Sequence, residues 1–103
     1  MVSLIYATTD TKETARTIAR ALVKEKLAAC VNIIPAVDSI YRWQGKIEEA
    51  AESALLAKTT EENVEQAIQL IRTLHPYDVP DIIVLPPVGG LKEYLTYVED
   101  ETL

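Results

Sequence analysis

Cysteine, histidine, glycine and phenylalanine are scarce or missing in this 103-residue chain, which has one cysteine, one histidine, three glycines and no phenylalanine. A single cysteine cannot form a disulfide within the chain, and this composition suits a reducing compartment. The apolar opening from Met1 to Ala7 lacks the basic flank of a signal peptide and soon meets Asp10. No stretch approaches the roughly 18 apolar residues of a membrane span. We therefore expect a cytoplasmic protein with no membrane contact.

Basic side chains are also in short supply, with 10 lysines and arginines against 16 aspartates and glutamates and a net charge of −6. Nucleic-acid binding rests mainly on basic side chains that neutralise phosphates, so this balance argues against a nucleic-acid partner. An acidic surface suits cations better than anions, but acidity of this degree mostly keeps a protein soluble. Charge alone therefore excludes one class of partner and assigns none.

The motifs of the common enzyme classes are missing. There is no CxxC pair, no HExxH, no glycine-rich phosphate loop and no GxSxG turn. Cys30 and His75 are the only residues of their kinds, so a catalytic cysteine–histidine pair is conceivable. Cys30 lies among apolar neighbours, however, where a thiol is usually an inert core residue. We expect a protein that is not an enzyme.

The chain does contain a regular succession of strand and helix patterns over residues 1–103, typical of one soluble domain. The apolar run Val2–Thr8 predicts a first strand. Asp10 with Glu13 forms a capping-box pattern, which predicts a helix over Lys12–Lys26. The apolar residues at helical spacing that should face its core are Ala15, Ile18, Ala19, Leu22 and Val23.

The longest feature is a hairpin over Leu27–Thr59, with its turn at Trp43–Lys46 and with Gly45 free to adopt the positive φ of a tight turn. Fully extended, the first arm from Ala28 to Trp43 would measure about 50 Å. A compact domain of this size is only about 35 Å across. The arm must therefore bend, with Pro35 the obvious place, or carry its tip onto another molecule, and Trp43 at that tip favours the second.

A second helix, a last strand and a terminal helix complete the pattern. Thr59 with Glu62 forms another capping box, and the helix that it starts ends near His75, where Pro76 forbids continuation. The run Asp81–Leu85 predicts the last strand. The order β-α-β-β-α-β plus a terminal helix indicates an α+β fold of the ferredoxin-like, split βαβ type. The inner residues expected on these two helices are Val64, Ala67, Ile68, Ile71 and Leu74, then Leu91, Tyr94, Leu95 and Val98.

The predicted strands are apolar on both faces, although an antiparallel sheet covered on one side should alternate between apolar and polar residues. Right-handed crossovers would place both main helices on the same face of the sheet. The other face then needs a cover, and the terminal helix is too short to be all of it. Another copy of the chain is the cover that we expect, so the sequence predicts a homo-oligomer.

Few residues are candidates for a binding site. His75 is either a metal ligand or a helix-capping histidine, and a tight transition-metal site would need further donors. Lys58 ends an apolar strand and either reaches solvent or holds an anion in a cleft. Trp43 either folds back on its own hairpin or anchors in a neighbour, as aromatic residues often do at interfaces. Acidic residues near the turn, such as Glu52, and on the second helix, such as Glu62, offer weak and unspecific binding to hard cations.

Four strings of the sequence, taken together and in order, resemble the divalent-cation tolerance protein CutA family: KLAACVNIIPAVDSIYRWQGKIE, LLAKT, LHPYDVPDIIVLP and GLKEYLTYV. The match covers essentially all of residues 1–103. The resemblance implies a ferredoxin-like fold assembled as a tight homotrimer in which the long hairpins cross between subunits, with Tyr41 and Trp43 at the interface. It also implies a likeness to the PII-type signalling proteins, which are trimeric sensors of small molecules.

Copper is the metal that the resemblance implies, because the family is associated with tolerance to copper and other divalent metals. Where members have a proposed copper site, its ligands are a first-strand cysteine and two consecutive histidines before the HPY proline. Tyr6 occupies the first of these positions here, and Leu74 with His75 occupies the other two, so only His75 matches. The candidate metal ligands are therefore His75 and Cys30, although Cys30 belongs to a different string of the family pattern.

The residues and the family resemblance together imply a cytoplasmic homotrimer that binds or senses copper or another divalent cation and needs no cofactor to fold. The alternative is a PII-like regulator that binds a small anionic ligand between its subunits. Lys58, His75 and Tyr77 would line such a cleft.

Overall fold

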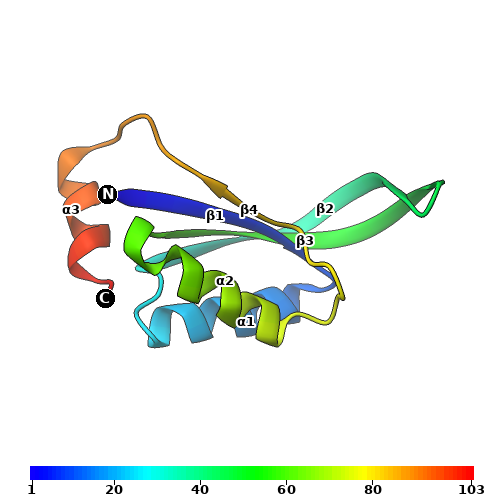
Figure 1. Ribbon diagram of the computed structural model, residues 1–103, viewed down its shortest axis with the longest axis horizontal. Helices are drawn as coiled ribbons and strands as arrows, with labels where there is room; N and C mark the ends of the chain where they lie inside the picture. Colours follow the sequence, from blue (N-terminus) through cyan, green and yellow to red (C-terminus); the bar gives the residue numbers. More distant parts are fainter.

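The computed structural model describes residues 1–103, which form one four-stranded antiparallel sheet and three α-helices (Figure 1). The strand order in the sheet is β2-β3-β1-β4, so the two long strands of the hairpin lie on one side of β1 and the short β4 lies on the other. The predicted order of elements is confirmed. None of the helices combines the length and the hydrophobicity that a membrane-spanning helix requires. The elements are β1 (Val2–Thr9), α1 (Lys12–Lys24), β2 (Cys30–Trp43), β3 (Lys46–Thr60), a 3-10 turn (Glu61–Asn63), α2 (Val64–Leu74), β4 (Ile82–Leu85) and α3 (Lys92–Asp100).

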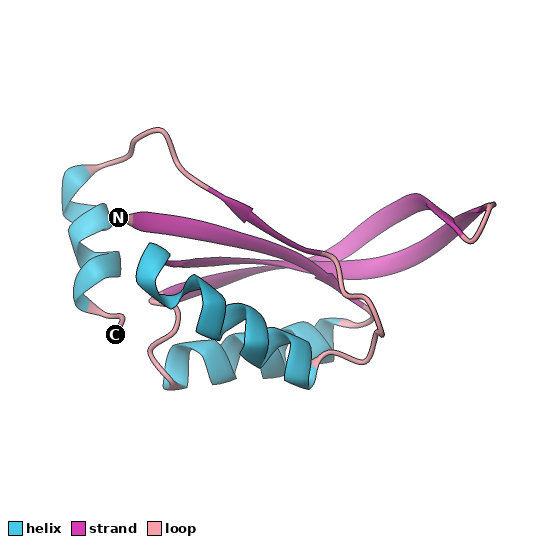
Figure 2. Cartoon of the chain, in the orientation of Figure 1, coloured by secondary structure: helices cyan, strands magenta, loops and turns pink.

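Helices α1 and α2 lie side by side against one face of the sheet, and α3 packs across the end of the sheet near the N-terminus (Figure 2). Alternate strand residues face the two long helices and are removed from water, because side chains in a strand point to opposite faces in turn. Burial of this apolar surface is the main force that holds the helices in place. The core residues are Ile5, Ala7, Ala15, Ile18, Leu22, Leu27, Ala28, Leu55, Ala57, Ala67 and Ile71.

The hairpin of β2 and β3 extends beyond the helices at the other end of the molecule, and the longest dimension of the chain is 44 Å (Figure 1). Its turn places Gln44 at φ 51° and Gly45 at φ 82°, so Gly45 has the positive φ that was predicted for a tight turn. The pairing between the arms shifts register between Ile34 and Val37, and Ser53 Oγ donates a hydrogen bond to the Pro35 carbonyl at 2.8 Å. The long arm is therefore irregular at Pro35 and also projects beyond the helices, so both predicted alternatives apply in part.

Both predicted capping boxes were placed one residue too early. The N-cap of α1 is Thr11 and not Asp10, because the Thr11 hydroxyl accepts a hydrogen bond from the Thr14 backbone N–H at 3.1 Å. Thr59 is a fully buried strand residue, and the chain leaves the strand only after Thr60. Thr60 is the N-cap residue of the 3-10 turn but makes no side-chain capping hydrogen bond, and α2 begins only at Val64.

Several residues expected in the core are more exposed than predicted. Val23 is 44% exposed and Leu91 is 70% exposed, because α1 ends at Lys24 and Leu91 precedes the first turn of α3. Cys30, expected to be buried, is only half-buried, since it is the first residue of β2. Helix ends are the least certain part of a periodic pattern, because the last turn has fewer neighbours to pack against.

The face of the sheet opposite α1 and α2 carries apolar side chains with no helix over most of it. The strand pairings place Tyr6, Leu56 and Ile83 side by side on this open face. Ile83 is 52% exposed, whereas Ile5 on the helix-covered face is fully buried. The structure thus bears out the prediction that both faces of the sheet are apolar. We call the set Leu4, Tyr6, Ile34, Leu56, Ile83 and Leu85 the open-face residues.

Candidate functional site

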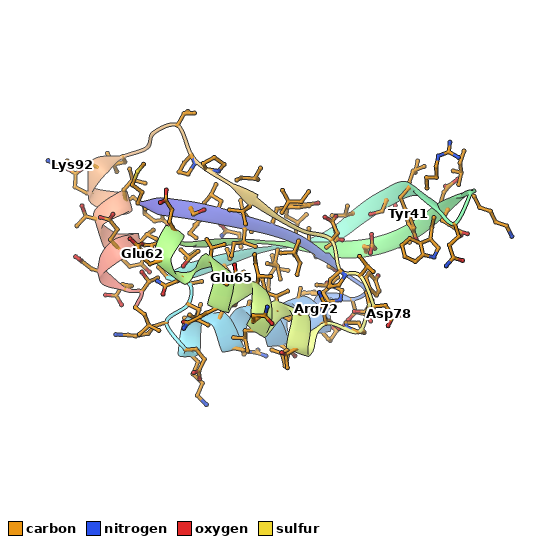
Figure 3. All side chains as sticks on the ribbon, in the orientation of Figure 1. Tyr41, Glu62, Glu65, Arg72, Asp78 and Lys92 are labelled. Carbon is orange, nitrogen blue, oxygen red and sulfur yellow. The ribbon has the colours of Figure 1, made fainter.

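An open hollow of about 730 Å³ lies where the hairpin leaves the body of the protein. One wall is formed by residues 37–41 and Trp43 of β2, and the other by the loop from Tyr77 to Asp81 that connects α2 to β4. The open-face residue Tyr6 lines its floor. Figure 3 shows Tyr41 on the hairpin and Asp78 on this loop, at the same end of the molecule. The volume falls within the range of about 300–1,000 Å³ that is usual for small-molecule sites.

The charged residues around this hollow are all acidic. Asp38, Glu52, Asp78 and Asp81 line it, and no lysine, arginine or histidine does. The single ion pair of the chain joins the N-terminal ammonium group to Glu99 at 3.9 Å, far along the sequence from these residues. The four carboxylates therefore have no cationic partner within the chain, and the hollow attracts cations and repels anions.

Tyr77 fastens the loop to the hairpin across the hollow. Its phenol O–H donates a hydrogen bond of 2.8 Å to Glu52 Oε2, and Glu52 is a half-buried residue of β3. Burial and the adjacent Glu52 carboxylate raise the pKa of the Tyr77 phenol above its ordinary value, since both disfavour a second negative charge. Thr8 holds the other end of the loop, because its hydroxyl donates to Asp81 Oδ2 at 3.4 Å.

His75 lies behind this loop as a buried structural residue. Its Nε2 is 2.7 Å from the Thr8 carbonyl oxygen, and its Nδ1 accepts a hydrogen bond from the Tyr77 backbone N–H at 3.2 Å. Nδ1 is therefore the acceptor and Nε2–H is the donor, because a neutral imidazole has one of each. The His75 ring also packs against the Tyr77 ring, with centroids 4.7 Å apart. A metal ion could bind His75 only after one of these hydrogen bonds breaks.

Cys30 and Lys58 lie at the other end of the sheet. They are paired across β2 and β3, with Lys58 Nζ 4.0 Å from Cys30 Sγ, and the Lys58 ammonium also lies 5.5 Å from the centre of the Tyr94 ring. Lys58 is six residues along β3 from Glu52, which is about 20 Å in an extended strand. Cys30 is thus remote from His75, and Lys58 is remote from Tyr77.

The sequence-predicted site residues therefore form two separate groups within one chain, His75 with Tyr77 at one end of the sheet and Cys30 with Lys58 at the other. No group of three or more histidine, cysteine, aspartate or glutamate side chains converges as a metal site would require. Together with the occupied ring nitrogens of His75, this means that the residues of one chain do not fit the copper site implied by the family pattern. The pairing of Lys58 with Tyr77 around an anion also finds no support in the acidic hollow beside Tyr77.

Three acidic residues of the hollow, Asp38, Asp78 and Asp81, were missed by the sequence interpretation. They are scattered over β2 and a loop, and only the fold brings them to the same place. Asp78 and Asp81 lie on either side of Pro80 in the string YDVPD. Loops between a helix and a strand often carry binding residues, so the position of this string was the sequence feature that could have identified them.

Comparisons with known proteins agree with this structure. The family model described as CutA1 divalent ion tolerance protein matches residues 3–101. The chain is 47% identical to the divalent-cation tolerance protein CutA of Thermus thermophilus over 102 residues, 99% of both chains, and a solved structure of that name superposes with a TM-score of 0.96. It is 38% identical over 99 residues to the chloroplastic protein CutA of Arabidopsis thaliana, covering 96% of this chain but only 54% of that one.

Proposed function

This chain belongs to the CutA1 divalent ion tolerance family, and from that premise we propose that it acts in divalent-cation tolerance as a homotrimer whose acidic hollows bind divalent cations. The observation that carries the binding part is the hollow itself, an open space of about 730 Å³ that four acidic residues and no basic residue line. Oxygen ligands suit hard divalent cations, and spaced carboxylates give weak, exchangeable binding. Such binding fits a tolerance protein that buffers or senses cations.

The homotrimer is proposed from the open face of the sheet. Exposed apolar surface of this kind usually marks a place where another protein docks. Ile34, Ile83 and Leu85 are 45%, 52% and 44% exposed in the isolated chain. A second copy packed against them would remove this surface from water, and Tyr41 and Trp43 on the projecting hairpin would reach the neighbour. The hollow would then lie at the boundary between copies.

We also propose a ferredoxin-like classification of the fold, a cytoplasmic location and a function without catalysis. The strand order β2-β3-β1-β4 with two crossing helices suits a ferredoxin-like classification. A chain with one half-buried cysteine suits the cytoplasm. The family name describes tolerance to divalent ions and not a reaction, so we propose binding without catalysis.

Light scattering tests the assembly. The wild type should report a mass three times the 11.4 kDa of one chain. Leu56→Asp places a charge on the open face and should shift the mass toward one chain, because an unpaired carboxylate is costly to bury in an interface. Val88→Asp, on a fully exposed loop residue, is the matched control and should leave the mass unchanged. A wild-type mass of one chain would refute the trimer.

Calorimetric titration with Cu²⁺ and Zn²⁺ tests the binding. The triple variant Glu52→Gln, Asp78→Asn, Asp81→Asn should lose at least tenfold in affinity, since it removes three of the four carboxylates of the hollow. The matched control removes three exposed carboxylates elsewhere, through Glu61→Gln, Glu65→Gln and Glu93→Gln. Equal losses in both variants would mean that cations bind the acidic surface as a whole and not the hollow.

A further inference from the structure

Helix α1 carries a row of basic side chains on its outer surface. Residues four apart in a helix lie on neighbouring turns, about 6 Å apart along the axis, so a row of four such residues is about 18 Å long. All four side chains of this row are exposed, and they are four of the ten basic residues of the chain. We call this row, which consists of Lys12, Arg16, Arg20 and Lys24, the α1 ridge.

The charges of the α1 ridge are separated from those of the rest of the chain. Glu13 is the only acidic residue of α1, whereas the residues outside α1 include 15 acidic and six basic side chains. The single ion pair of the chain joins the N-terminal ammonium group to Glu99, so no carboxylate of the chain forms an ion pair with the ridge. Lys12 borders a small hollow that Asp10 and Asp38 also line, so the three ridge residues that follow Lys12 are the most isolated from acidic groups. A surface that only keeps a protein soluble usually mixes charges of both signs, which this helix does not.

The α1 ridge also opposes the stability of its own helix. Like charges four residues apart on a helix repel each other, and the ridge contains three such pairs in succession. Lys12 lies in the first turn, where the positive end of the helix dipole disfavours a cation. Real proteins break such local rules chiefly where a function requires it. A bound anionic partner therefore explains the ridge better than the needs of the fold do.

An exposed apolar residue lies beside the ridge. Val23 is 44% exposed, and it follows Arg16 by seven residues and Arg20 by three, which places it on the same side of α1. Protein–protein interfaces combine apolar contacts with charged and polar groups around them. A partner that has both carboxylates and apolar side chains therefore matches this surface better than a phosphate polymer does.

We propose that the α1 ridge binds an acidic α-helical segment of another protein, with carboxylates against the basic side chains and an apolar residue against Val23. The spacing favours a helix, since glutamates four residues apart on a helix repeat at the same interval of about 6 Å. The charge of the whole chain, −6, favours a short segment over a membrane or a nucleic acid. An extended anionic surface would meet the acidic remainder of a molecule that is 44 Å long, whereas a short segment contacts the ridge alone.

The α1 ridge is independent of the proposed cation site. Helix α1 lies on the covered face of the sheet, opposite to the open face, and none of its residues lines the hollow of about 730 Å³ (Figure 2). In the proposed homotrimer the copies would cover the open face and leave the ridge of each chain exposed. Loss of the trimer or of cation binding would therefore leave this proposal standing, and its own failure would leave the proposed function standing.

Fluorescence anisotropy with a labelled synthetic peptide tests the proposal. The peptide is an alanine-rich helix with glutamate at every fourth position and one leucine, and its control has the same composition with the glutamates at irregular positions. The full-length protein in low salt, where surface charges are screened least, should bind the regular peptide at least fivefold more tightly than the irregular one. Equal affinities for the two peptides, or no binding of the regular peptide, would overturn the proposal.

Two double variants locate the binding surface. Arg16→Gln with Arg20→Gln should weaken the binding of the regular peptide at least fivefold. The matched control, Arg72→Gln with Lys92→Gln, removes the same charge from exposed positions of α2 and α3 and should bind the peptide as the wild type does. Equal losses in both variants would mean that net charge and not the ridge attracts the peptide, which would overturn the proposal.

Thermal denaturation checks the argument from repulsion. The ridge variant should melt at the same temperature as the wild type or at a higher one, because it relieves repulsion between exposed side chains. A lower melting temperature would mean that the ridge stabilises its own helix, and the need for a partner would be lost.

Two further titrations separate a protein partner from other anionic partners. Vesicles of phosphatidylserine and phosphatidylcholine in equal parts, and a short DNA duplex, should both bind the wild type more weakly than the regular peptide does. If either binds more tightly and that binding is lost in the ridge variant, the ridge is a site for a lipid surface or for a nucleic acid, and the proposed protein partner is wrong.

Discussion

The two faces of the sheet have similar apolar residues and very different surroundings. On the helix-covered face Ile5 and Leu55 are fully buried, whereas on the open face Ile34 and Ile83 remain 45% and 52% exposed. Leu55 and Leu56 are identical neighbours in β3, yet one is part of the core and the other lies on the open face. An apolar pattern in a strand therefore predicts that a face will be covered, but it does not say by which element.

The largest expected effect comes from substituting Leu55 and Leu56 separately. Leu55→Ala should lower the free energy of unfolding by about 2–5 kcal/mol, because it leaves a cavity in a close-packed core. Leu56→Ala should cost the isolated chain less, since a half-buried side chain loses fewer contacts. Urea denaturation of both variants measures the difference. Equal losses of unfolding free energy in a sample shown to be monomeric would mean that the two faces of the sheet contribute equally to the stability of the chain.

The next effect concerns His75, which links the end of α2 to the carbonyl of Thr8 in β1. His75→Ala should cost about 1–3 kcal/mol of unfolding free energy, because it leaves the Thr8 carbonyl and the Tyr77 N–H without their partners. Copper affinity by calorimetry should stay the same, since both ring nitrogens are already engaged. A variant that keeps its stability and loses copper binding would restore His75 as a metal ligand.

A smaller effect is expected at the start of α1, the helix that covers one face of the sheet. Thr11→Ala should lower the unfolding free energy by about 1 kcal/mol, because the hydroxyl that accepts from the Thr14 N–H is lost. Asp10→Ala is the comparison and should cost less, since Asp10 lies outside the cap. Thermal denaturation of the two variants shows which substitution destabilises the protein more. The reverse order would reinstate the capping box at Asp10.

The smallest effect concerns Tyr77 and appears only in alkaline solution. The pKa of its phenol is raised in the folded state, so its contribution to stability is complete below its unfolded-state pKa of about 10. That contribution is lost as the pH rises above this value toward the folded-state pKa. Tyr77→Phe should therefore show a shallower decline of unfolding free energy at high pH than the wild type. Tyr97→Phe, outside the hollow, is the control, and identical slopes for Tyr77→Phe and the wild type would contradict the prediction.

The fold was largely predictable from the sequence because periodic apolar patterns determine which residues can be buried together. The spacing of Ala15, Ile18 and Leu22 predicted α1, and the tight turn at Gly45 predicted the hairpin. The cap of α1 was missed by one residue, because Asp10 and Thr11 can both cap a helix and only the backbone conformation after the strand decides between them.

The site was much less predictable, since it depends on residues that are distant in sequence. Glu52 was treated as one of several acids near the turn, and only the strand pairing and the Tyr77 hydrogen bond reveal its place. His75 was singled out because it is the only histidine, but rarity in a sequence does not distinguish a ligand from a residue with buried structural bonds.

The register shift at Pro35 reverses the parity of β2. Before it, Ile34 pairs with Ala54, and after it Val37 pairs with Glu52, so β2 advances three residues while β3 advances two. Even-numbered residues of β2 face the open side before the shift, and odd-numbered residues face it afterwards. Tyr41 and Trp43 therefore face the same side as Glu52 because the bulge leaves one residue of β2 without a partner in β3. If β2 instead paired with β3 residue for residue from Ile34 onward, Ile40 would lie opposite Glu48 and Arg42 opposite Lys46, and both rings would turn to the other side of the hairpin.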